Sequence, residues 1–221
     1  MALIRLEKIR KVYGSGDTAT AALKDVTLEV EDGEFVMLTG KSGCGKTTLL
    51  NILGGIERAS AGNYLFDGKE VFKGNPDRLA AFRNRNIGYV FQAYYLIDGL
   101  RVIENVELPL GYAKVKRGER RSRAAEALKR VSLEDRARYY PNQLSGGQQQ
   151  RAAIARAIVN VPKVLLADEP TGNLDEENRL EIMRLLAELH ESGMTIIMVT
   201  HDMDLLSYAT KVYHMADGRF E

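Results

Sequence analysis

Several short apolar runs in this chain have the length and character of buried strands. They lie at residues 35–39, 87–91, 164–167, 195–200 and 212–215. Helical patterns at 46–53 and 176–191 separate some of these runs. This alternation is typical of a mostly parallel sheet that helices cover on both faces, so the predicted fold class is α/β.

The residues that follow four of these runs point to one shared site. In chain order they are Gly40, Gln92, the pair Asp168 and Glu169, and His201. Because ligands of open α/β sheets bind beyond the carboxyl ends of the strands, we expect these residues to lie close together.

The segments before and after the first run predict a second, smaller sheet. Residues 2–12 and 23–30 resemble strands of alternating or mixed polarity, and residues 63–72 fit a hairpin around Asp67 and Gly68. We therefore expect a small antiparallel sheet beside the main one.

Residues 93–144 are polar and helical in pattern, with the clearest helix at 117–131. They predict a helical subdomain, at approximately 93–150, that is inserted into a single domain of residues 1–221.

Residues 40–47 read GKSGCGKT and match the phosphate-loop pattern G-x-x-x-x-G-K-[ST]. The glycines let the backbone aim N–H groups at phosphate oxygens. Lys46 would reach the β- and γ-phosphates, Thr47 would ligate Mg²⁺, and Thr48 would begin a helix whose dipole supports the same charge. The residues predicted to bind ATP are Gly40, Lys41, Ser42, Gly43, Cys44, Gly45, Lys46, Thr47 and Thr48.

Cys44 lies inside this loop and is the only cysteine of the chain. A small neutral filler is the favoured interpretation, rather than a catalytic group. A thiol beside a helix N-terminus and a lysine is nevertheless reactive. We expect alkylation of Cys44 to inhibit the protein and ATP to slow that reaction.

Asp168 and Glu169 end an apolar strand and are expected to have different tasks, because adjacent side chains of an extended chain point in opposite directions. Asp168 suits a Mg²⁺ shell, directly or through water. Glu169 is the candidate general base for a water that attacks the γ-phosphate. At the ends of the other strands, His201 would steady that water, and the Gln92 amide would touch Mg²⁺ or water.

Residues 144–148 read Leu-Ser-Gly-Gly-Gln. Ser145 is a good N-cap and Gln148 occupies the capping-box position, so a helix is predicted to begin here. Its free N–H groups and positive dipole end would suit an anionic phosphate.

Charge and composition exclude several classes of function. Lys and Arg number 31 against 30 Asp and Glu, and this near-balance lacks the basic footprint of a general nucleic-acid binder. A single cysteine forms no internal disulfide, which suits a reducing compartment. The N-terminus does not resemble a signal peptide, and no apolar run approaches the roughly 18 residues of a membrane span. Any membrane role would therefore require a partner.

Five motifs occur in the order seen in ATP-binding cassette ATPases, which this chain resembles over essentially its whole length. They are GKSGCGKT, Gln92, LSGGQ, LLADE and His201. Further segments resemble the branch that serves lipoprotein release, macrolide export and cell division. These segments are ENVELPL at 104–110, QLSGGQQQRAAIARAI at 143–158, LADEPTGNLD at 166–175 and VTHD at 199–202. The resemblance implies a P-loop NTPase core of the RecA type, with ATP and Mg²⁺ as cofactors.

The resemblance also implies roles that spacing does not reveal. Tyr13 would stack on adenine, and Asp175 would contact the opposing subunit. Ser145, Gly146 and Gly147, with Gln148 beside them, would bind the γ-phosphate of ATP held by a second copy. The ATPase would thus be a head-to-tail homodimer with two nucleotides at its interface.

A membrane partner is implied as well. Gln92 and nearby residues such as Tyr94 and Tyr95 would face an integral-membrane permease, which places the chain at the cytoplasmic face of the cell membrane. Two alternatives remain open: a transmembrane regulator of cell-wall enzymes that transports nothing, and a soluble ATPase acting on nucleic acid or the ribosome. Nucleic acid is not expected. The substrate, the direction of transport and the identity of the permease are not encoded in this chain.

A basic cluster stands at the start of the helical segment. Its members are Lys114, Lys116, Arg117, Arg120, Arg121 and Arg123. Anionic lipid head groups or an acidic permease loop could bind it, but a solvated helix face is the favoured interpretation.

Overall fold

The computed structural model describes residues 2–73 and 75–221, and the larger of its two sheets has six strands. Their order is β10-β9-β3-β8-β7-β6, and only β10 runs antiparallel to its neighbour. The strands are β3 (Phe35–Thr39), β6 (Ile87–Val90), β7 (Val164–Asp168), β8 (Thr195–Val199), β9 (Lys211–Ala216) and β10 (Arg219–Phe220). The carboxyl ends of the parallel strands therefore meet at one edge.

The second sheet is antiparallel, in the order β2-β1-β4-β5. Its strands are β1 (Ile4–Tyr13), β2 (Thr20–Val30), β4 (Ala61–Phe66) and β5 (Lys69–Glu70), and a 3₁₀ turn, η1 (Gly16–Thr18), links the first two. β4 and β5 form the hairpin predicted around Asp67 and Gly68. The expected antiparallel sheet is confirmed.

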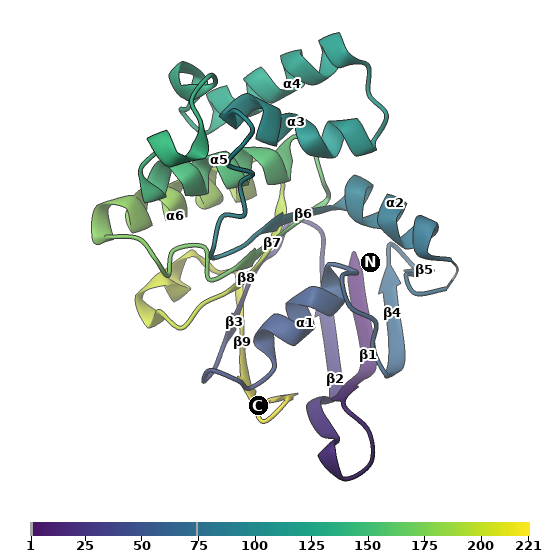
Figure 1. The fold of residues 1–221 in the computed structure, drawn as a ribbon. Helices are drawn as coiled ribbons and strands as arrows, with labels where there is room; N and C mark the ends of the chain where they lie inside the picture. The colour runs from purple at the N-terminus through teal and green to yellow at the C-terminus, as the bar shows by residue number, and fades with distance from the viewer. Residues whose placement is uncertain (1, 74) are drawn as a thin grey trace.

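The parallel strands separate two hydrophobic cores because their side chains alternate between two covered faces. In β3, Phe35 and Met37 pack into one core, while Val36 and Leu38 pack into the other. The first core holds the helices α3 to α6, and the second holds α1 and the antiparallel sheet. Figure 1 shows this arrangement, with α5 and α6 on one side of the parallel strands and α1 with the antiparallel sheet on the other. An all-apolar strand is thus what burial on both faces requires.

Six α-helices appear in the part of the chain described here. They are α1 (Lys46–Leu53), α2 (Pro76–Asn86), α3 (Val102–Tyr112), α4 (Arg117–Arg130), α5 (Gly146–Ile158) and α6 (Glu176–Glu191). Shorter 3₁₀ turns are η2 (Glu134–Arg136), η3 (Pro141–Gln143) and η4 (Met203–Tyr208). Among them, no helix combines the length and the apolar character that crossing a bilayer needs.

α2 is the one long helix that the sequence pattern does not predict. Its start signal is local: the Asn75 side chain accepts a hydrogen bond from Arg78 N, and Pro76 stands at the first helical position. Its apolar content is low and only Leu79 is buried, so periodicity gives little indication of it.

α3 and α4 pack on each other and on α5 at one end of the molecule (Figure 1). The predicted subdomain boundary near residue 150 falls inside α5, which continues to Ile158. α5 therefore reaches from this helical layer to the parallel sheet, where it packs on β6.

Candidate functional site

The loop between β3 and α1 wraps around the ammonium group of Lys46. Lys46 is 6% exposed, and its Nζ donates hydrogen bonds to the carbonyls of Gly40 (2.7 Å) and Lys41 (2.9 Å). Gly40 has φ 139°, and a Cβ there would lie 2.1 Å from the carbonyl oxygen of Met215 in β9. The loop can therefore approach β9 this closely only with glycine at this position.

Thr47, at the start of α1, faces Asp168 at the end of β7. Thr47 Oγ1 donates a hydrogen bond to Asp168 Oδ1 at 3.3 Å. Burial raises the pKa of Asp168, and the charge of Glu169 adds to that effect, while the Thr47 hydrogen bond and Lys46 oppose it. A hydroxyl beside a carboxylate offers the hard oxygen ligands that Mg²⁺ prefers, with phosphate oxygens and water completing its shell. These two residues fit the predicted metal site.

Glu169 and His201 come together from the ends of β7 and β8. His201 Nδ1 lies 3.3 Å from Glu169 Oε2, and the His201 side chain is 67% exposed. One expectation needs correction: Glu169 is not extended but has φ 46°, because the chain turns out of the sheet after Asp168. Its N–H donates to the carbonyl of Val199, and its carbonyl accepts from Gly172 N. The two acids still face different partners.

Gln92 follows β6 and lies against the loop after Glu169. Gln92 Nε2 donates to Asn173 Oδ1 at 3.3 Å, and Asn173 Nδ2 donates back to the Gln92 carbonyl at 3.4 Å. A Cβ at Gly172 would lie 2.8 Å from Gln92 Nε2. The Gln92 amide thus contacts this loop, and its contact with Mg²⁺ or water stays a prediction.

Tyr13 lies at the end of β1, next to the start of α1. Its hydroxyl donates to Glu57 Oε2 at 2.6 Å and lies 3.5 Å from Thr48 Oγ1, while Lys11 Nζ lies 4.9 Å from its ring centroid. Burial and the Glu57 hydrogen bond raise the pKa of Tyr13. The ring is 41% exposed, which leaves area for a planar base near the phosphate loop.

The predicted capping box at the start of α5 is present. Gln148 N donates to Ser145 Oγ at 3.3 Å, and Ser145 N donates to Gln148 Oε1 at 3.1 Å. Ser145 is exposed, whereas Gly147 is buried against Asn178 of α6. Asn178 N and Nδ2 both donate to the carboxylate of Asp175, the N-cap of α6.

The start of α5 does not meet the phosphate loop within one chain. A Cβ at Gly146 would lie nearest to Tyr94 and Leu174, and among the described residues none of the hydrogen bonds of residues 145–148 reaches residues 40–48. Figure 1 likewise draws α5 and α1 in separate parts of the molecule. The five residues predicted to follow the strands lie at the carboxyl edge of the parallel sheet, and the pentapeptide lies elsewhere. The five are Gly40, Gln92, Asp168, Glu169 and His201.

Three residues near this site escaped the sequence analysis: Asn173, Gln150 and Arg156. Gln150 is fully buried, and its Nε2 donates to the Pro170 carbonyl at 2.7 Å. Its position in a run of three glutamines conceals it, but it shares a helix face with Ile154 and Ile158, and this periodicity is a usable signal of burial. Asn173 and Arg156 carry no comparable signal.

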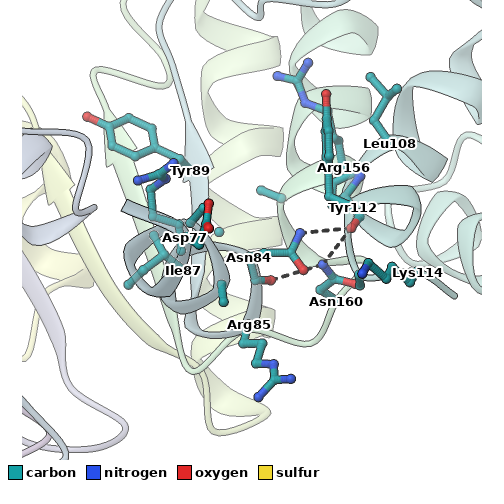
Figure 2. A pocket seen from close by; sticks show the side chains of 17 residues that line it. Asp77, Asn84, Arg85, Ile87, Tyr89, Leu108, Tyr112, Lys114, Arg156 and Asn160 are labelled. Carbon is teal, nitrogen blue, oxygen red and sulfur yellow. Dashed lines mark hydrogen bonds between the residues drawn. The ribbon is translucent and has the colours of Figure 1, made fainter. Parts of the chain in front are cut away.

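A groove of about 1020 Å³ lies between α2, α3 and the end of α5. Across it, Asn84 Nδ2 and Asn160 Nδ2 donate to the carbonyl of Pro109 at 2.9 and 3.3 Å (Figure 2). The charged residues of its lining are Asp77, Arg83, Arg85, Lys114 and Arg156. Tyr112, also in the lining, is 80% exposed. The groove is thus predominantly cationic, with an exposed aromatic side chain.

The other histidines have structural partners. His190 Nε2 lies 2.8 Å from the Gly33 carbonyl, and His214 Nδ1 lies 3.0 Å from Thr39 Oγ1. Within the basic cluster, Arg121 and Arg123 pair with Glu107 and Glu119. Such exposed pairs agree with a solvated helix face.

Comparison with known proteins gives a consistent family assignment. The family model described as ABC transporter matches residues 23–172. An uncharacterised ABC transporter ATP-binding protein of Methanocaldococcus jannaschii is 46% identical over 216 residues, which is 98% of this chain and 96% of that protein. The macrolide export ATP-binding/permease protein MacB of Hyphomonas neptunium is 47% identical over 217 residues, or 98% of this chain and 34% of the longer protein.

Solved structures show the same fold. The dimeric structure of MJ0796, a bacterial ABC transporter cassette, has a TM-score of 0.91 and 43% sequence identity, and the match covers 99% of this chain and 96% of that one. A dimeric post-hydrolysis state of MJ0796, bound to ADP and Pi, also matches with a TM-score of 0.91 and 42% identity, over 99% of this chain and 96% of that one.

Proposed function

Because this chain belongs to the ABC transporter family of ATP-binding proteins, we propose that two copies close head to tail on two ATP molecules and drive a separate membrane permease. The proposal of a dimer is supported by the separation of two predicted phosphate-binding elements within one chain. The loop at 40–47 and the helix start at Ser145 are both built for anions, but within one chain they do not meet. A second copy, turned head to tail, brings them to one nucleotide. The MJ0796 structures, which are dimeric, support association of two copies.

The residues of one copy divide the hydrolysis of ATP among them. The loop N–H groups and Lys46 would hold the β- and γ-phosphates, and Thr47 and Asp168 would hold Mg²⁺, which would neutralise phosphate charge. Glu169 accepts the proton of the attacking water. His201, 3.3 Å from that carboxylate, orients the water and stabilises developing charge.

The second copy contributes Ser145 and Gly146 to the γ-phosphate, with Asp175 near the dimer interface. Loss of that phosphate after hydrolysis removes the contacts that hold the two copies together. One phosphate thereby biases a rigid-body opening, a common form of molecular switch.

The groove between α2 and α3 is our candidate for the permease contact. It is cationic and carries the exposed Tyr112, so it fits a cytoplasmic segment with acidic and apolar side chains. The membrane partner is supported by MacB, whose name joins ATP-binding and permease functions in one protein. Such a partner would hold this chain at the cytoplasmic face of the membrane.

The experiment compares Glu169→Gln with Glu177→Gln, a matched change at an exposed position in the first turn of α6. Glu169→Gln is expected to bind ATP, to hydrolyse it about 10²- to 10⁴-fold more slowly and to elute as an ATP-dependent dimer. Glu177→Gln should behave as wild type. Turnover of Glu169→Gln near the wild-type rate would exclude Glu169 as the base.

Ser145→Arg tests the contribution of the second copy. Introduced into the Glu169→Gln protein, it is expected to abolish the dimer while ATP still binds the monomer. Loss of ATP binding by the monomer would mean that Ser145 acts within its own chain, contrary to the proposal.

A detergent pull-down with the full chain identifies the partner. Recovery of a multi-span membrane protein supports a membrane partner. If that partner controls a cell-wall enzyme and transports nothing, the regulator is indicated instead. Recovery of nucleic acid or ribosomes would support a soluble ATPase.

A further inference from the structure

The segment on either side of Gln92 is fastened to α5, the helix that begins at the Leu-Ser-Gly-Gly-Gln pentapeptide. Arg156, in the last turn of α5, donates from Nη2 to the Tyr94 carbonyl at 2.6 Å and from Nη1 to the Tyr95 carbonyl. Both tyrosines have φ 48°. This left-handed backbone is costly for a bulky side chain, so it requires a partner that holds it in place.

Gln150 forms a second attachment on the other side of Gln92. Its Nε2 donates to the Pro170 carbonyl and lies 3.5 Å from the carbonyl of Phe91, the residue before Gln92. The side chain is fully buried, and its Oε1 has no hydrogen-bond partner in the part of the chain that the structure describes. Since Oε1 is unsatisfied, the buried Gln150 amide stabilises the fold through the hydrogen bonds that its Nε2 donates.

Arg156 is bound to backbone carbonyls rather than to an acid. Burial lowers its pKa, and among the residues with described coordinates no carboxylate forms an ion pair with it. Its place at the carboxyl end of α5 favours a cation through the helix dipole. A planar guanidinium can serve two adjacent carbonyls at once, which a lysine ammonium does less well.

The opposite end of α5 also meets this segment, because a Cβ at Gly146 would lie 3.0 Å from the Tyr94 hydroxyl. We propose that Arg156 and Gln150 are positioning residues that fix the Gln92 segment to α5. The place of the Gln92 amide then depends on the position of the helix whose start faces the second copy. This inference rests on the proposed ATPase function and on the predicted contact of the Gln92 amide with Mg²⁺ or the attacking water.

The first measurement compares Arg156→Met with Arg151→Met. Arg151 lies on the same helix and pairs with Glu181 of α6, so its variant controls for loss of a guanidinium from α5. In hydrogen–deuterium exchange, amides of residues 92–97 should exchange faster in Arg156→Met, and those of 40–50 should not change. Misplacement of a catalytic group by about 1 Å can reduce turnover by on the order of 100-fold, so we expect kcat to fall about tenfold with KM within about twofold.

The second measurement is a double-mutant cycle with Gln92→Ala. If Arg156 acts through Gln92, the double variant is no slower than Gln92→Ala alone. Independent, multiplying losses would overturn the inference, and so would unchanged exchange at 92–97. Full activity of Gln92→Ala would instead refute the predicted role of the Gln92 amide in hydrolysis.

Two further variants keep the test decisive if Arg156→Met does not fold. Arg156→Lys should show a smaller increase in exchange at 92–97, because one ammonium replaces two paired donors. Gln150→Met, of similar volume, should loosen the same segment from its other side. Wild-type exchange in both variants would overturn the inference.

Discussion

Gly147 in the pentapeptide is required by packing between two helices, and replacing it by alanine tests this directly. A Cβ at residue 147 would lie 1.9 Å from Asn178 Oδ1, whereas real Cβ contacts essentially never fall below 3.0 Å. Asn178 would have to move by roughly 1 Å or more, as in other overpacked cores. That movement breaks the hydrogen bonds from Asn178 Nδ2 to Asp175, each 2.9 Å long.

Overpacking of this kind costs about 1–3 kcal/mol, and alanine recovers roughly 0.5–1 kcal/mol of that through its helix propensity. The expected net loss is about 1–2 kcal/mol, or about 2–8 °C in Tm for a chain of this length. Thermal denaturation of the nucleotide-free protein measures it.

The decisive comparison repeats Gly147→Ala in an Asn178→Ala background. With the amide gone, only the Cβ of residue 178 stays close, at 3.1 Å from the new Cβ, so alanine at 147 should cost much less and its helix propensity should offset most of the remainder. An equal loss of Tm in both backgrounds would refute the packing argument. It would place the requirement for glycine in the backbone of α5 instead.

Three further results are expected. Burial raises the pKa of Asp168 above its usual 3.8, so the folded protein binds the proton of this carboxyl more tightly than the unfolded chain does. The stability that this proton contributes should be lost as pH rises through the raised pKa, and Asp168→Asn should remove that decrease from a Tm-against-pH series. Cys44, 3.8 Å from Lys46 Nζ, should be alkylated by N-ethylmaleimide with loss of activity, and ATP should slow the labelling; an unchanged rate would place the nucleotide elsewhere. Tyr112→Asp should abolish recovery of a membrane partner without changing the ATPase rate of the isolated chain, with Lys129→Glu on exposed α4 as the control; retained recovery would exclude the groove.

Most of the site could be predicted because its parts are local. A strand, a glycine-rich turn and a helix start are contiguous in residues 35–53, and each carries its own signal. The apolar run before Asp168 and Glu169 likewise identifies a strand buried on both faces. These segments are expected to meet because ligands of open α/β sheets bind beyond the carboxyl ends of the strands. The 3.3 Å contact of Thr47 with Asp168, 121 residues away, agrees with this expectation.

The contacts of Gln92 could not be predicted in this way. Its partner Asn173 is 81 residues distant, and the Arg156 bonds to Tyr94 span 62 residues. Neither pairing has a periodicity or a turn signature, since each depends on how two loops and a helix pack. The left-handed backbone of Glu169 is similar, because its conformation is fixed by hydrogen bonds to Val199 and Gly172.

The sequence by itself predicted the chemistry, namely a triphosphate-binding loop, an acid pair and a second anion-binding helix start, because each is encoded within a few neighbouring residues. Tertiary structure alone decided which of these elements lie close together. It placed Ser145 away from the loop that holds Lys46, since α5 packs with the helical layer while α1 lies between the two sheets. The proposed division of one site between two copies therefore rests on this packing.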